Sequence, residues 1–272
     1  MTKLIQTVIT SGDSFIWGSE LSDDQGTKTF SLKTFPAIVA ADYNYICTAW
    51  PGIGNEGIAR AIIDKCQSSD RNNIFVFVVW SAPGRYEFRF KYDTKQKNSP
   101  WYTFDKWTIA DNIDDLRPEF LNQSESIINK QSITLDNAKI SGVSEFASSY
   151  YKHIGNSEYW EIYTSLKEIV YLQNYLLANN IPYLFSCVDS SIIYNYTIDH
   201  ADVTISSLYN QIQFDKWFLF PPGELTDRPE GFYQWAINNK YEVGALHPLD
   251  EAHKIAAELI KEKFDELVKK HY

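Results

Sequence analysis

Residues 11–18, Ser-Gly-Asp-Ser-Phe-Ile-Trp-Gly, follow a β-branched run at residues 4–9 that is typical of a strand. Ser14 is therefore expected where a strand ends and a loop or helix begins. Open α/β sheets keep their functional groups at that edge. Serine is also common at turns and helix starts, where it caps backbone amides. Ser14 is thus a candidate nucleophile, with a capping role as the alternative.

Three further runs indicate strands that lie beside the first one, at residues 45–50, 73–80 and 181–189. The run at 73–80 is apolar almost to its end, as in a parallel strand that is buried on both faces. Apolar residues at helical spacing predict helices at 32–43, 58–66, 158–179 and 255–268. The alternation predicts a three-layer α/β/α domain with a flavodoxin-like parallel sheet of four or five strands.

An aromatic-rich insertion is predicted after the third strand, at about residues 86–159. Aromatic and charged residues alternate over 86–93, and aromatic residues recur as far as Trp107. This pattern predicts an antiparallel hairpin with one aromatic face. The face is either buried, the commoner outcome, or a platform for a sugar ring or acyl chain. The 272 residues fit one domain, 1–272, that includes this insertion.

The composition excludes several classes of protein. A formal net charge of -10 and the lack of a Lys/Arg stripe argue against a nucleic-acid partner. The three cysteines show no CxxC spacing, and neither His153, His200 nor His271 has the spacing of a metal ligand. No metal or cofactor is implied. No apolar run fits a signal peptide or a membrane span, so we expect a cytoplasmic protein that is not bound to a membrane.

A possible base for Ser14 lies near the C-terminus, in the segment Asp250-Glu251-Ala252-His253. Asp250 fits the N-cap of the last helix, and a spacing of three places it beside His253 on one turn. A carboxylate there would orient the imidazole as a general base. The alternative is a cap and an ordinary first-turn histidine. His247 is expected to line the substrate pocket or to cap local structure, outside the catalytic step.

Together, Gly12-Asp13-Ser14 and the Asp-x-x-His spacing of Asp250 and His253 resemble the first and last sequence blocks of the SGNH/GDSL hydrolase family. Gly52 matches the second block, a glycine after the second strand. The resemblance covers most of the chain outside the insertion. It implies that Ser14 Oγ attacks an acyl carbonyl, that His253 takes the proton, and that Asp250 orients His253.

The same resemblance implies an oxyanion hole formed by the backbone N–H groups of Ser14 and Gly52. The third block departs from the family, which has Gly-x-Asn-Asp where this chain reads Trp-Ser-Ala-Pro-Gly-Arg at 80–85. Ser81 or Arg85 is the expected third donor, ahead of Asn55. The residues expected to contact the substrate are Asn55, Trp80, Arg85 and His247.

The predicted function is hydrolysis of an ester, either an O-acetylated carbohydrate or another small acyl ester. A weaker likeness to bacteriophage-encoded GDSL-like proteins suggests an alternative from another class. In that alternative the chain is a non-catalytic binding or structural protein, such as a phage particle component, on the same scaffold. Self-association into a homo-oligomer and association with a virion both stay open as partner predictions.

A dinucleotide site is the last alternative, because residues 52–57 form a GxGxxG between a predicted strand and a predicted helix. The glycines follow the second strand instead of the first, and the next strand ends without a carboxylate for a ribose. Both departures disfavour this interpretation.

Overall fold

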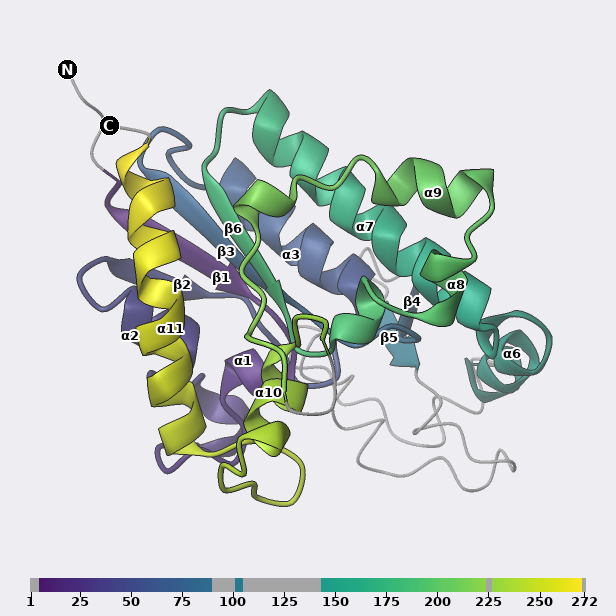
Figure 1. Ribbon diagram of the computed structural model, residues 1–272, viewed down its shortest axis with the longest axis horizontal. Helices are drawn as coiled ribbons and strands as arrows, with labels where there is room; N and C mark the ends of the chain where they lie inside the picture. Colours follow the sequence, from purple (N-terminus) through teal and green to yellow (C-terminus); the bar gives the residue numbers. More distant parts are fainter. Residues whose placement is uncertain (1–4, 90–100, 105–142, 224–226, 271–272) are drawn as a thin grey trace, which may run out of the picture.

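The computed structural model describes residues 5–89, 101–104, 143–223 and 227–270. At its centre is a parallel sheet in the order β2-β1-β3-β6 (Figure 1). The strands are β1 (Thr7–Ser11), β2 (Asn44–Cys47), β3 (Ile74–Trp80) and β6 (Tyr183–Cys187). This order is that of flavodoxin-like sheets. The predicted α/β/α fold class is confirmed, and the sheet has four strands within the described ranges.

Alternate residues of β3 enter two different cores, which explains why the whole strand is apolar. Val76 and Val78 pack on one face of the sheet, and Phe75 and Phe77 on the other. The first face is covered by α3 (Asn55–Gln67) and α7 (Glu158–Ala178). The second is covered by α2 (Phe35–Val39), α10 (Phe232–Asn238) and α11 (Asp250–Lys269), as Figure 1 shows. The chain therefore forms three layers.

Shorter elements follow the carboxyl ends of the strands. They are α1 (Ser14–Trp17), α6 (Val143–Tyr150), α8 (Tyr196–Asp199), α9 (Val203–Tyr209), a π-helical turn (Tyr151–Gly155) and single 3-10 turns at Gly26–Lys28, Ser190–Ile192 and Phe214–Lys216. Among the described helices, none is long and apolar enough to cross a membrane.

The predicted hairpin is present as β4 (Tyr86–Arg89) paired antiparallel with β5 (Trp101–Phe104). Tyr86 is buried and packs edge-on against Tyr150 and Tyr151, so this aromatic residue of the insertion serves the core. Trp107, the poorly periodic segment 111–142 and His271 lie outside the described residues.

Candidate active site

Ser14 is the first residue of α1, directly after β1. Asp13 caps this short helix, its Oδ1 accepting the N–H of Phe15 at 3.1 Å. A Cβ on Gly12 would lie 2.5 Å from Cγ1 of Ile16, so only glycine fits before the turn. The prediction that Ser14 stands where a strand ends and a helix begins is confirmed.

The Ser14 hydroxyl is hydrogen bonded to His247, whose Nε2 lies 2.8 Å from Oγ. His247 is buried and precedes α11 in a turn closed by a bridge between Val243 and Pro248. Its ring packs against Phe15, with centroids 4.6 Å apart. Hence the imidazole is held beside the serine by the chain that follows α10.

Glu20 lies on the other side of the same imidazole, with Oε1 2.9 Å from His247 Nδ1. Its Oε2 accepts the N–H of Leu246 at 3.2 Å and that of His247 at 3.5 Å. Burial raises the pKa of Glu20, but the hydrogen bond from His247 and the N–H of Leu246 outweigh it and lower the pKa. An ionised carboxylate can only accept, so Nδ1 carries a proton, and in the neutral imidazole Nε2 then accepts from Ser14.

The predicted pairing of Ser14 with His253 is wrong in geometry. His253 lies within the core on α11, where its Nδ1 accepts the N–H of Phe35 at 3.2 Å. The imidazole stacks on the ring of Phe35 and packs against Phe232. Burial lowers the pKa of His253 to about 3. This histidine is therefore neutral and part of the core.

Asp250 contacts Ser22 and Lys33 in place of the predicted partner, His253. Asp250 is the first residue of α11, after an N-cap at Leu249, so it is not the cap that was predicted. Its carboxylate accepts from the backbone and hydroxyl of Ser22 and pairs with Lys33 Nζ at 2.6 Å. Burial opposes ionisation, but these partners lower the pKa of Asp250 to about 2. Asp250 thus ties α11 to the segment after α1.

Two predicted oxyanion donors are the backbone N–H groups of Ser14, at the start of α1, and of Gly52, in the turn after β2. Within the described residues, neither amide donates to a backbone carbonyl. Gly52 has a φ of 80°, a conformation that favours glycine. Both amides therefore stay candidates for binding an oxyanion.

Ser81 and Arg85, the predicted third donors, both bind the carboxylate of Asp13. Oδ2 of Asp13 accepts from Ser81 Oγ at 2.7 Å and from Arg85 Nη1 at 2.8 Å. Asn55 bridges the backbone of Ser81 in both directions, at 2.9 and 3.2 Å, and donates to Ser165 Oγ. These groups hold the turn before Ser14 in place.

Trp80 does not lie at the site, contrary to the sequence prediction. Its side chain is fully buried in the core that α3 and α7 cover, edge-on to Phe185. Since residues of β3 alternate between the two faces, the last position of the strand still points into a core.

The glycine-rich turn is filled by protein groups and not open to a phosphate. The N–H of Gly54 donates to Glu87 Oε1 at 3.1 Å, and a Cβ on Gly57 would lie 2.1 Å from the same carboxylate. Glu87 is buried and pairs with Arg60 at 2.5 Å. The Glu87 side chain thus occupies the space beside these glycines that a pyrophosphate would need, which contradicts the dinucleotide interpretation.

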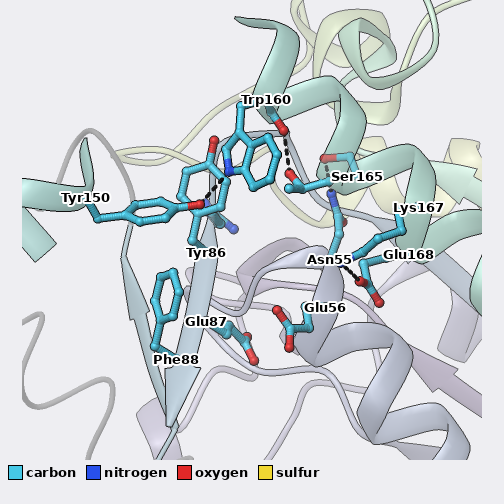
Figure 2. Close-up of a pocket in the computed structure, with 12 residues that line it drawn as sticks. Asn55, Glu56, Tyr86, Glu87, Phe88, Tyr150, Trp160, Ser165, Lys167 and Glu168 are labelled. Carbon is cyan, nitrogen blue, oxygen red and sulfur yellow. Dashed lines mark hydrogen bonds and ion pairs between the residues drawn. The ribbon is translucent and has the colours of Figure 1, made fainter. Parts of the chain in front are cut away.

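A cavity of about 160 Å³ adjoins this network and is drawn in Figure 2. Two predicted substrate contacts, Asn55 and Arg85, line it. Figure 2 shows aromatic rings gathered on one side and carboxyl groups on the other. The remaining lining residues are Glu56, Tyr86, Glu87, Phe88, Tyr150, Trp160, Thr164, Ser165, Lys167 and Glu168.

Glu56 is a titratable side chain that lines this cavity. Burial, with smaller contributions from Glu168 and Glu87, raises the pKa of Glu56 to about 7. Glu168 pairs with Lys167 at 3.1 Å and Arg85 with Asp13, so ion pairs within the protein account for much of the other charge. The cavity therefore offers hydrogen-bond donors and acceptors beside an apolar surface.

The sequence interpretation missed two members of the site, His247 as the partner of Ser14 and Glu20 as the partner of His247. His247 had been given only a lining or capping role. Its position just ahead of the last amphipathic helix was the available signal. Glu20 stands in a polar stretch after α1 and carries no spacing signal of its own.

Two solved structures are similar to the chain in arrangement. One is a member of the lipolytic protein G-D-S-L family from Veillonella parvula DSM 2008, and the match covers 96% of this chain and 100% of that one. The other is the psychrotrophic esterase EstA from Pseudoalteromonas sp., in a structure inhibited by monoethylphosphonate, with 97% of each chain covered. Each has a TM-score of 0.44 and 12% identity. No protein-family model and no curated protein matches the chain. At this similarity, neither activity carries over to the chain.

Proposed function

We propose that the chain is a serine hydrolase that cleaves an ester, with Ser14 as nucleophile and His247 as general base. The observation that supports it is the continuous set of hydrogen bonds from Ser14 Oγ through His247 to a carboxylate, at 2.8 and 2.9 Å. This arrangement activates a serine hydroxyl, which is otherwise a weak nucleophile.

The reaction proceeds in two halves. Ser14 Oγ attacks the carbonyl carbon while His247 Nε2 takes the hydroxyl proton. The tetrahedral oxyanion is then stabilised by the N–H groups of Ser14 and Gly52. His247 gives the proton to the leaving oxygen of the ester as the carbon–oxygen bond breaks. The alcohol departs, and the acyl group stays bound to Ser14 Oγ. In the second half, a water molecule attacks the acyl carbonyl carbon while His247 Nε2 takes its proton. His247 then returns this proton to Ser14 Oγ, and the carboxylic acid is released.

The alcohol part of the ester is proposed to be a carbohydrate bound in the cavity of Figure 2. Trp160 and Tyr150 offer rings on which a sugar can stack. Glu56 and Ser165 offer acceptors and donors for hydroxyl groups. Arg85 lines the cavity and also binds Asp13, so an ion pair links one wall residue of the cavity to the residue before Ser14. An O-acetylated sugar is the substrate that combines both regions.

A fluorophosphonate probe and acetyl esters test the two parts of the proposal. We expect the probe to label the wild-type chain at Ser14 and to leave Ser14→Ala unlabelled, with kcat for p-nitrophenyl acetate reduced on the order of 10⁴-fold or more. An O-acetylated methyl glycoside should give a higher kcat/KM than ethyl acetate. Trp160→Ala should remove that preference and keep the labelling.

An unlabelled, folded wild-type chain would exclude the hydrolase and favour the binding or structural protein. Labelling without a preference for the glycoside would keep the hydrolase and exclude the carbohydrate part of the proposal.

A further inference from the structure

We infer that Glu20 is the positioning residue for His247 and that its carboxylate occupies the space that a side chain at residue 244 would fill. The inference rests on the proposed hydrolase. It concerns a different question: which segment of the chain supplies the acid behind the histidine, and why residue 244 is a glycine.

Gly244 stands three residues before His247, and its N–H donates to the carbonyl of His247 at 2.9 Å. The two ends of this tight turn therefore lie together. The same spacing of three separates Asp250 from His253, so residues 244–247 repeat the Asp-x-x-His pattern with glycine in the place of aspartate.

A Cβ built on Gly244 would lie 2.2 Å from Oε2 of Glu20. Real Cβ atoms do not approach an oxygen so closely, so a side chain at 244 and the present position of Glu20 exclude each other. The other oxygen of that carboxylate is 2.9 Å from His247 Nδ1. A short carboxylate attached at 244 would therefore point into the region from which Glu20 now binds the imidazole.

The backbone conformation at Glu20 directs its side chain toward His247. Glu20 has a φ of 69°, a left-handed conformation that residues other than glycine rarely adopt. Its own N–H donates to Asp24 Oδ2 at 2.8 Å, which fixes the turn after α1. The two carboxylate oxygens of Glu20 contact different groups. Oε1 lies beside the imidazole of His247, and Oε2 accepts from the N–H groups of residues 246 and 247. Glu20 thus orients the histidine and also docks the turn that carries it.

The two roles can be separated by changing one atom of the side chain. In Glu20→Gln, the remaining carbonyl oxygen can accept from the turn, whereas the amide presents N–H groups where the carboxylate had oxygens. A Gln that keeps the turn in place therefore offers no anion to an imidazolium. A residue with a purely structural role would tolerate this change.

Five variants test the inference: Glu20→Ala, Glu20→Gln, Gly244→Ala, and Glu20→Ala combined with either Gly244→Asp or Gly244→Glu. Each is measured by its rate of fluorophosphonate labelling, by kcat for p-nitrophenyl acetate, and by its melting temperature. We expect both Glu20 variants to lose 10²- to 10⁴-fold in kcat, with Glu20→Gln melting near the wild type.

The double variant with Gly244→Asp should regain at least tenfold in kcat over Glu20→Ala. Gly244→Ala alone should lose activity, because its methyl group displaces Glu20. A second double variant, Glu20→Ala with Gly244→Glu, covers the case in which aspartate is too short. Labelling of Glu20→Ala at the wild-type rate would overturn the inference, as would folded double variants that both stay as slow as Glu20→Ala. An unlabelled wild type would instead overturn the proposed hydrolase.

Discussion

His247 and His253 stand six residues apart, and their surroundings assign them opposite roles. His247 lies in a turn between a serine hydroxyl and a carboxylate, at 2.8 and 2.9 Å. His253 lies one turn into α11 between two phenylalanine rings, and its hydrogen bond comes from the backbone of Phe35. The partners come from residues 14, 20 and 35, far away in the sequence. A histidine's chemistry is therefore decided by what the fold brings to it.

The largest change in activity is expected when each of the two imidazoles is removed in turn. His247→Ala should lower kcat for p-nitrophenyl acetate on the order of 10⁴-fold or more, because the serine loses its base. His253→Asn should stay within about threefold of the wild type, since Oδ1 of asparagine can accept from Phe35 in place of Nδ1. The reverse order of the two variants would restore the assignment of His253 as the base.

An intermediate effect concerns stability against pH. His253 has a folded-state pKa of about 3, below the ordinary value of 6.5, so between these values the unfolded chain binds a proton that the folded chain does not. Its contribution to stability is complete above pH 6.5 and is lost as the pH falls toward 3. The slope from this one group is about 1.4 kcal/mol per pH unit.

Urea unfolding from pH 7 to pH 4 should therefore be less pH-dependent in His253→Asn than in the wild type. The comparison uses the difference between the two chains, because carboxyl groups such as Asp250 contribute equally to both. Parallel curves for the two chains would show that His253 is not a buried neutral imidazole.

The smallest effect on activity and stability is expected for Asp250, in contrast to Glu20. Asp250→Asn should change the free energy of unfolding by about 1 kcal/mol or less, because the Asp250–Lys33 pair is partly exposed and asparagine can still accept from Ser22. Its kcat should stay within about twofold of the wild type, in contrast to Glu20→Gln. A loss of activity as large as that of Glu20→Gln would return Asp250 to the site.

The sheet and the position of Ser14 could be predicted because both depend on local pattern. The unbroken apolar run of β3 predicts a strand buried on two faces, and Ser14 follows a β-branched run. The histidine could not be chosen this way. A spacing of three places Asp250 and His253 on one turn, but only tertiary packing shows that this turn faces Phe35 and Ser22.

Glu20 could not be predicted for a related reason. Its side chain reaches His247 only because residue 20 has a positive φ and residue 244 has no side chain, and these two facts belong to segments at opposite ends of the chain. Trp80 shows the same limit. Its place at the end of a strand suggested a pocket, whereas its face of the sheet leads into a core.

The distribution of the site along the chain also affects its synthesis. Ser14 and Glu20 leave the ribosome 233 and 227 residues before His247. A nascent chain that ends before residue 243 would carry the serine and the carboxylate without an imidazole to join them. The proposed acyl chemistry would therefore begin only when the turn that carries His247 has docked against Ser14 and Glu20.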